Sequence, residues 1–340
     1  MKHEPRKSPL PSEAFRRASE RQKRGPEPEP TPDPQPKPTA QPSVEDPPPT
    51  VSLIAELEQF LRRFVLLPEA GYLPVAVWII GTHVSLKFDC FAYLAILSPA
   101  KRCGKTRLLE LIELFSERPW RGTAPSAAAL FRMMANAPTL LLDENEALNQ
   151  KNPSESSQAI LAILNAGHRK GATIPRCDGP SHALKFFPVY GPKAFAAIGK
   201  LPDVLMDRSI IIPMQRRAQD QKLERFRSTR APKEAKPIRD RLAQFCKSHE
   251  AAINDAYQRW LDKDLDYLGD RDADLWIPLF ALCELTAPDR VEDLKKNAQQ
   301  LCNDKAEEDL EESLALTLLR DIRGYGPSTK RSSQIKHWKV

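Results

Sequence analysis

The chain has 340 residues, 41% apolar and 28% charged, with a formal net charge of +6, and this apolar content suffices for a sizeable core in one or two domains. The six cysteines have no C-x-x-C spacing, which argues against a zinc site and fits reduced thiols. The longest apolar runs are too short to cross a bilayer and the N-terminus lacks the apolar region of a signal peptide, which favours a cytoplasmic protein without membrane insertion.

Residues 1–50 differ in composition from the rest of the chain. They hold 14 of the 32 prolines, many of them alternating with polar residues. Such a stretch cannot bury enough apolar surface to fold, and it favours an extended polyproline-type conformation. We therefore predict a disordered, proline-rich basic tail over 1–50 that is available to a protein partner.

Two helices are predicted where the folded part begins. Apolar residues recur at helical spacing over 53–64, with Ser52 in the position of an N-cap. A second apolar segment over 75–80 also favours a helix, which the Gly-Thr-His sequence at 81–83 ends.

An apolar run over 91–97 leads into a polar turn and then into a leucine-rich segment with helical spacing. The turn ends in Gly104, Lys105 and Thr106, which predicts the order strand, phosphate loop, helix. In such a loop the glycine lets the backbone approach an anion, the lysine reaches the terminal phosphates and the threonine holds Mg²⁺. The remaining predicted nucleotide-binding residues precede them in the same turn: Lys101, Arg102 and Cys103.

The loop departs from the pattern G-x-x-x-x-G-K-[ST] at its first position, where Pro99 stands in place of glycine. The proline ring confines φ to a narrow range of negative values, so the entry to the loop must be built without a positive φ at this position. A Gly-Lys-Thr tripeptide alone is weak support for phosphate binding, and the strand before it and the helix after it strengthen the prediction.

A second motif follows a predicted short strand at 119–121 and a predicted helix at 125–135, which has Pro125 in its first turn. An aliphatic run over 139–142 ends in Asp143 and Glu144. In a P-loop ATPase the first acid would hold Mg²⁺ through water and the second would polarise the attacking water. Apolar strands that end in Asp-Glu also occur by chance. Here one predicted strand and one predicted helix lie between the phosphate-loop helix and the two acids. With this spacing, each motif strengthens the interpretation of the other as part of a P-loop ATPase site.

A basic cluster follows a predicted helix over 156–166. His168, Arg169 and Lys170 lie between two glycines, and Arg176 comes shortly after them. A short basic loop can follow a phosphate backbone, so these residues are candidates for contacts with nucleic acid. An ordinary exposed turn is the alternative. No partner with ligand spacing accompanies His168, which argues against a metal ligand.

Residues 186–213 predict a strand, an apolar segment at 194–198, a short helical turn and a last strand at 209–212. Arg208 directly precedes this last strand. An arginine held rigidly there could be delivered to the γ-phosphate of a neighbouring subunit, which would require a homo-oligomer. Alternatively, it pairs with Asp203 or Asp207.

The C-terminal part, 218–322, is charged and helix-patterned, and it offers five core residues: Trp260, Trp276, Leu279, Phe280 and Leu282. Between residues 216 and 241 the chain has ten basic and four acidic residues, which favours a polyanionic partner unless these are solvated helix faces. We predict a P-loop ATPase core with N-terminal helices at 51–217, a helical lid at 218–322 and a basic tail at 323–340.

Four segments together resemble a family of proteins of unknown function. That family is found in phage, plasmid and actinobacterial proteins, often at the end of primase-type or helicase-like replication proteins. The segments are SPAKRCGKTRLLE at 98–110, PTLLLDE at 138–144, NAGHRKGATIPR at 165–176 and FPVYGPKAFAAIGKLPDVLMDRSI at 187–210. The resemblance spans about residues 53–300. The family begins its loop with Ser-Pro, as this chain does at Pro99, and often has serine where this chain has Cys103.

The resemblance implies an α/β fold, with the parallel sheet of an AAA+-like P-loop NTPase and a C-terminal helical domain. It implies ATP and Mg²⁺ as cofactors, with Lys105 and Thr106 on nucleotide and metal, Asp143 and Glu144 on metal and water, and Arg208 as an arginine finger. The expected function is a DNA helicase or translocase-like ATPase of mobile-element or phage replication. The alternatives are an ATP-dependent switch or loader that acts on a protein, and a P-loop DNA-binding module without hydrolysis.

Overall fold

The structure is a computed structural model that describes residues 51–122, 126–143, 154–178, 183–218 and 220–324. The predicted tail at 1–50 lies outside these ranges, as do residues 325–340 of the predicted tail at 323–340, Pro125 and Glu144. Side chains are described throughout the ranges except at 51–52, 308–309 and 311–324.

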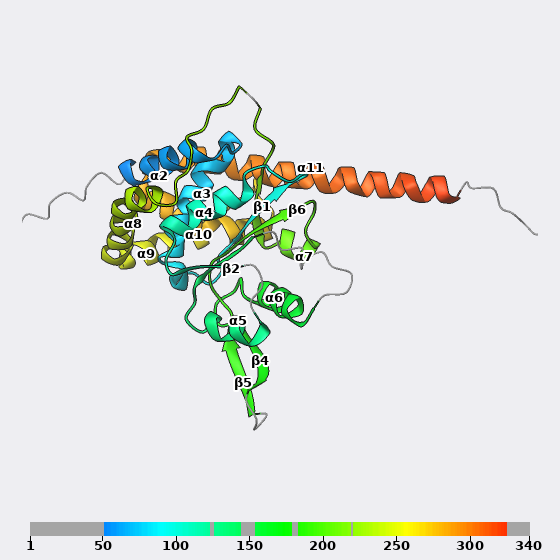
Figure 1. Ribbon diagram of the computed structural model, residues 1–340, viewed down its shortest axis with the longest axis horizontal. Helices are drawn as coiled ribbons and strands as arrows, with labels where there is room; N and C mark the ends of the chain where they lie inside the picture. Colours follow the sequence, from blue (N-terminus) through cyan, green and yellow to red (C-terminus); the bar gives the residue numbers. More distant parts are fainter. Residues whose placement is uncertain (1–50, 123–125, 144–153, 179–182, 219, 325–340) are drawn as a thin grey trace, which may run out of the picture. The chain divides into compact units, whose positions relative to one another are not determined.

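A five-stranded sheet forms the centre of the fold (Figure 1). Its strands are β1 (Tyr93–Ser98), β2 (Pro119–Gly122), β3 (Thr139–Leu142), β6 (Lys193–Ile198) and β7 (Ser209–Pro213). They pair in the order β2-β3-β6-β1-β7, and every pair is parallel. The α/β fold with a parallel sheet core is therefore confirmed.

The sheet is covered on both faces, as the continuous aliphatic character of its strands requires. Alternate residues of β1 point to opposite sides, so Leu94 and Ile96 belong to one hydrophobic core while Tyr93, Ala95 and Leu97 belong to a second. The first core also contains α4 (Lys105–Phe115), and the second contains α5 (Ala127–Met134), α6 (Glu155–Ala166) and α7 (Asp203–Met206).

The helices of the C-terminal part share the first core with the helices at the start of the described chain. The former are α8 (Ala231–Ser248), α9 (Glu250–Leu261), α10 (Asp270–Thr286) and α11 (Val291–Gly324), and the latter are α2 (Val51–Phe64) and α3 (Glu69–Thr82). Helix α3 contacts α10 and α11, while α2 contacts α8. Two 3₁₀ turns, η2 (Ser85–Lys87) and η4 (Pro288–Arg290), complete the helical part.

The five predicted core residues of this part, from Trp260 to Leu282, are all buried. The boundary predicted between 217 and 218 does not separate two hydrophobic cores in the described residues, because one cluster runs from Leu53 to Leu301.

A two-stranded antiparallel hairpin stands between α6 and β6 in the chain. It consists of β4 (Thr173–Asp178) and β5 (Ala183–Pro188), and it packs on α5 and α6 (Figure 1). Arg176, a predicted nucleic-acid contact, therefore lies on a strand, opposite Lys185 in the register of the hairpin. The residues at 173–174 find their strand partners at 187–188, which the local pattern did not reveal.

Two predicted helix starts are also wrong. Helix α2 begins at Val51, so Ser52 lies in its first turn and is not its N-cap. Helix α5 begins at Ala127 after Ser126, whose hydroxyl accepts a hydrogen bond from the N–H of Ala129 at 3.3 Å. The hydroxyl of a serine at the N-cap accepts a hydrogen bond from a backbone N–H of the first turn, and a proline side chain offers no such acceptor. This explains why the helix begins after Ser126 and not at the predicted Pro125. Among the described residues, no helix has the length and apolar character needed to cross a membrane.

Candidate nucleotide-binding site

The predicted phosphate loop lies between the end of β1 and the start of α4, at the carboxyl edge of the sheet. Gly104 directly precedes α4 with φ at 89°, and a Cβ there would meet Met214 Cε at 3.3 Å. Arg102 also has a positive φ, 66°. The loop therefore turns at these two residues, and Pro99 at its entry is compatible with the fold because no positive φ is needed there.

Lys105 is held inside this loop and is 5% exposed. Its Nζ donates to Ser98 Oγ at 2.6 Å and to the carbonyl oxygen of Ala100 at 3.3 Å. The thiol of Cys103 donates to the same carbonyl at 3.2 Å. The lysine, the end of β1 and the loop backbone thus form one hydrogen-bonded unit.

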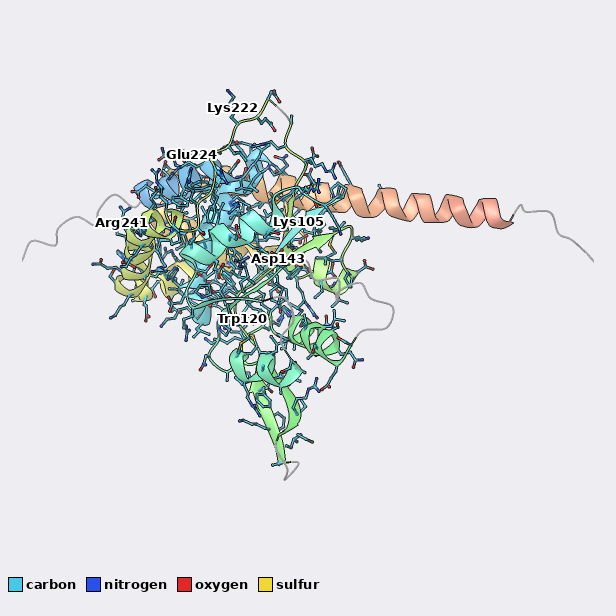
Figure 2. All side chains as sticks on the ribbon, in the orientation of Figure 1. Lys105, Trp120, Asp143, Lys222, Glu224 and Arg241 are labelled. Atoms are coloured by element: carbon cyan, nitrogen blue, oxygen red, sulfur yellow. The ribbon has the colours of Figure 1, made fainter. Side chains whose placement is uncertain are left out.

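Thr106 and Asp143 meet although they follow two strands, β1 and β3, that are not neighbours in the sheet. Strand β6 lies between β1 and β3, yet Thr106 Oγ1 donates to Asp143 Oδ1 at 3.1 Å. Figure 2 shows Lys105 and Asp143 in this part of the molecule. A hydroxyl and a carboxylate side by side are ligands suited to Mg²⁺. Glu144, the predicted catalytic acid, lies outside the described residues.

Arg121 is a neighbour of this site that the sequence analysis did not single out. It lies on β2, with Nη1 at 4.0 Å from Asp143 Oδ2 and Nε at 2.7 Å from Glu113 Oε2. The predicted strand at 119–121 contained the signal, because parallel strands bring their carboxyl ends to the same edge.

Arg216 also borders this site, although the sequence indicated only that the segment 216–241 is basic and did not point to this residue. The chain leaves β7 beside the phosphate loop, where the N–H of Met214 donates to Leu97 O at 2.7 Å. Two residues later, Arg216 Nε donates to the carbonyl oxygen of Lys101 at 3.1 Å. Lys101 and Arg102 are exposed, so these three side chains bring positive charge to the rim of the loop.

Arg208 and the predicted basic cluster at 168–170 lie at the amino edge of the sheet. The carbonyl of Arg208 accepts from Tyr93 N at 3.0 Å and that of His168 accepts from Phe91 N at 3.1 Å. The N–H of Lys170 donates to Asp89 O at 2.8 Å. Since β1 runs for 6 residues between the two edges, roughly 20 Å separates this group from the phosphate loop.

The hairpin carries Arg176 to a third place, where its guanidinium lies 4.7 Å from the centre of the Phe131 ring. The structure therefore brings together the predicted nucleotide and metal residues that it describes. It does not bring the basic cluster or Arg208 to them within one chain.

The alternative that Arg208 pairs with Asp203 or Asp207 is wrong. Arg208 Nη1 donates to the main-chain oxygen of Asn165 and, at 3.4 Å, to Asn165 Oδ1. Asp207 instead forms an ion pair with Arg271 of α10. This helix comes much later in the chain, and only the tertiary fold brings its arginine to Asp207.

Comparison with protein families finds a match in the C-terminal part of the chain. A family described as "Protein of unknown function (DUF3631)" matches residues 213–336, a range that leaves the phosphate loop, Asp143 and Arg208 outside it. No curated protein matches the chain.

Among solved structures, the chain is similar to the "SCCmec type IV Cch - active helicase" with a TM-score of 0.42 and 11% sequence identity. The similarity covers 84% of this chain and 57% of that helicase, so the chain spans little more than half of its length. A likeness at this level carries no argument about activity.

Proposed function

We propose that this protein is a P-loop ATPase with an AAA+-like core that binds ATP and Mg²⁺ at the carboxyl edge of β1. The hydrogen bond between Thr106 and Asp143 is the observation that supports this most strongly. This hydrogen bond brings Asp143, which follows β3, next to Thr106 at the start of α4. A metal ion held by both residues requires this proximity.

The residues of this site have distinct roles in the proposal. The backbone N–H groups of 101–104 and the amino end of α4 face the phosphates. Lys105 exchanges its contacts with Ser98 and Ala100 for phosphate oxygens. Thr106 and Asp143 hold Mg²⁺, which neutralises charge that develops on the phosphates. Glu144 orients and polarises the attacking water.

Arg208 serves a second copy of the chain. It lies at the opposite edge of the sheet from the phosphate loop of its own chain, so it can reach only a nucleotide that another subunit holds. Hydrolysis then requires a homo-oligomer in which the amino edge of one sheet faces the carboxyl edge of the next.

We propose DNA as the substrate that such an assembly moves, in the manner of a replicative helicase or translocase of a mobile element or phage. The hairpin supports this, because Leu184 and Phe186 lie on the same face of β5 and are exposed at 62% and 59%. An exposed aromatic ring such as that of Phe186 is suited to stacking with a base of a single strand.

ATP hydrolysis measured with and without DNA tests the proposal. We expect hydrolysis that DNA stimulates and that Lys105→Ala abolishes, while Lys247→Ala on the exposed face of α8 behaves as wild type. Hydrolysis that DNA leaves unchanged would favour a switch or loader acting on a protein partner of residues 1–50. Nucleotide binding without hydrolysis, with Glu144→Gln equal to wild type, would leave a P-loop DNA-binding module.

A further inference from the structure

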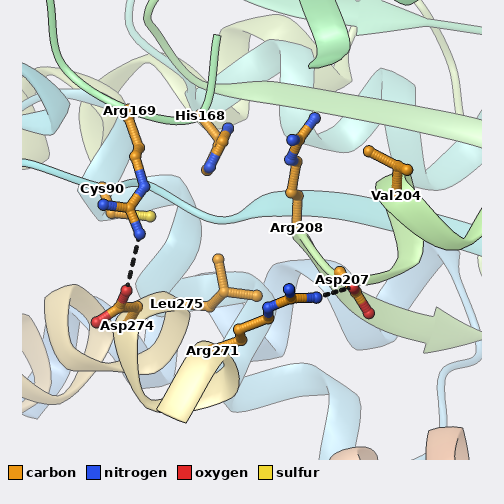
Figure 3. A pocket seen from close by; sticks show the side chains of 9 residues that line it. All are labelled: Cys90, His168, Arg169, Val204, Asp207, Arg208, Arg271, Asp274 and Leu275. Atoms are coloured by element: carbon orange, nitrogen blue, oxygen red, sulfur yellow. Dashed lines mark hydrogen bonds and ion pairs between the residues drawn. The ribbon is translucent and has the colours of Figure 1, made fainter. Parts of the chain in front are cut away.

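A cavity of about 270 Å³ opens at the amino edge of the sheet, away from the phosphate loop (Figure 3). Four parts of the fold line it, and three of them carry its arginines and carboxylates. The turn after α6 contributes His168 and Arg169, the segment between α7 and β7 contributes Asp207 and Arg208, and α10 contributes Arg271 and Asp274.

The charges in this cavity do not cancel. Arg169 pairs with Asp274 at 3.1 Å, and Arg271 pairs with Asp207. Arg208 contacts the uncharged Asn165, so the three guanidinium groups face two carboxylates and leave a net positive charge.

The two remaining titratable groups that line the cavity do not alter this balance at neutral pH. Burial, together with the nearby charges of Arg208 and Arg169, lowers the pKa of His168 to about 4. Burial raises the pKa of the Cys90 thiol to about 11. The histidine is therefore uncharged and the cysteine is a thiol, so the surplus charge belongs to the arginines.

The backbone that carries these groups is fixed. An antiparallel bridge joins Cys90 to Arg169, and hydrogen bonds tie the carbonyls of His168 and Arg208 to the chain at Phe91 and Tyr93. The arginine on α10 is held less firmly, because the side chains of Arg271 and Asp207 are 80% and 42% exposed and an exposed ion pair is weak.

Arginine presents a planar fork of donors that matches phosphate oxygens. A recessed cavity admits a terminal phosphoryl group, whereas a continuous phosphodiester backbone needs an open groove. We propose that this cavity binds a terminal phosphoryl group between Arg208 and Arg271, with Asp207 holding Arg271 until that dianion takes its place.

The source of the phosphoryl group rests on the proposed function: it is the γ-phosphate of ATP on the phosphate loop of a neighbouring copy. Arg271 then becomes a second arginine acting between subunits, supplied by the helical part of the chain. The anion site itself stands on the cavity and its charges, whether or not the chain hydrolyses ATP.

Inorganic phosphate is the probe, titrated by calorimetry into the full chain carrying Lys105→Ala, so that the phosphate loop does not contribute. We expect saturable binding that weakens about ten- to a hundredfold when Arg208→Ala or Arg271→Ala is added, because each removes a charge-assisted hydrogen bond. Asp207→Asn should tighten binding, because it releases Arg271. The matched control is Glu250→Gln, which breaks an exposed ion pair with Lys87 at 2.8 Å outside the lining of the cavity and should change nothing.

Far-ultraviolet circular dichroism checks that each variant is folded, and Arg271→Lys, which keeps the charge and loses the fork, replaces any alanine variant that is not. The proposal is overturned if the Lys105→Ala chain binds no phosphate, or if binding survives the loss of both arginines. Displacement of phosphate by a single-stranded oligonucleotide without terminal phosphates would also overturn it, in favour of a backbone site.

A mixing experiment tests separately whether the phosphoryl group belongs to ATP on a neighbouring copy of the chain. Lys105→Ala chains and Arg271→Ala chains, each inactive alone, should together recover ATP hydrolysis, because the mixed assembly contains some sites with both an intact loop and an intact cavity. Absence of hydrolysis in the wild type would refute the proposed function while the phosphate titration still decides the cavity.

Discussion

Thr106 is the side chain on which the proposed metal site depends, because its hydroxyl links the phosphate loop to Asp143 at 3.1 Å. Thr106→Val keeps the volume and removes the oxygen. We expect ATP affinity in the presence of Mg²⁺ to fall by roughly tenfold to a hundredfold, the equivalent of one hydrogen bond to a charged group. Binding of a fluorescent ATP analogue with and without Mg²⁺ measures this. Equal losses in both conditions would show that the hydroxyl does not serve the metal.

Lys193 is fully buried and was not selected from the sequence. Its Nζ donates to the carbonyl oxygens of Gly167, Val189 and Gly191 at 3.0, 2.8 and 2.9 Å. These bonds tie the turn that carries the basic cluster to the start of β6. Lys193→Met leaves the three carbonyls without this donor, so we expect the free energy of unfolding to fall by about 1–3 kcal/mol, as measured by urea denaturation at pH 7.

The same lysine predicts a dependence of stability on pH. Burial lowers its pKa from 10.5 to about 7, so between these values the unfolded chain binds a proton that the folded chain does not. This contribution makes the free energy of unfolding rise as pH increases from 7 toward 10.5. Urea denaturation at pH 7 and pH 9 should show a smaller difference for Lys193→Met than for wild type. An unchanged difference would mean that another group causes the dependence.

Two neighbouring phenylalanines of the hairpin of β4 and β5 are expected to have different roles, Phe186 in binding DNA and Phe187 in stability. Phe186 is 59% exposed, whereas Phe187 is 5% exposed and belongs to the second core. Phe186→Ala should leave stability within about 0.5 kcal/mol and weaken binding of single-stranded DNA by about 1–3 kcal/mol, the worth of one stacked base. Phe187→Ala should instead cost about 3–5 kcal/mol of stability. Fluorescence anisotropy and thermal melting distinguish the two, and DNA affinity that is unaffected by Phe186→Ala would remove the hairpin from the interface.

The shared core of the N- and C-terminal helices predicts how the whole chain unfolds. One hydrophobic cluster includes Leu57 of α2, Trp78 of α3 and Trp276 of α10, so these helices depend on one another for burial. We expect a single transition in which circular dichroism and tryptophan fluorescence coincide. Two separated transitions would instead support the predicted boundary between 217 and 218.

Most individual elements could be predicted from the sequence. The strand, loop and helix around Lys105 follow from local signals, since an aliphatic run, a Gly-Lys-Thr tripeptide and a helical repeat follow one another directly in the chain. The strands before Asp143 and after Arg208 were predicted for the same reason. The hairpin was not fully predicted, because β4 is mostly polar and its strand character comes from pairing with β5.

Short-range patterns in the sequence by themselves determined most of the strands and helices, the position of the predicted phosphate loop and the residues that meet at the proposed metal site, and the family resemblance implied the α/β class. Such patterns act between residues that are close in the chain, and they fix which element each residue occupies. Only the tertiary structure decided that Arg208 lies at the edge opposite Lys105, that Arg271 holds Asp207, and that Arg121 and Arg216 border the loop. These relations depend on the order of the strands and on helix packing, because contacts between residues far apart in the chain leave no periodic trace in the sequence.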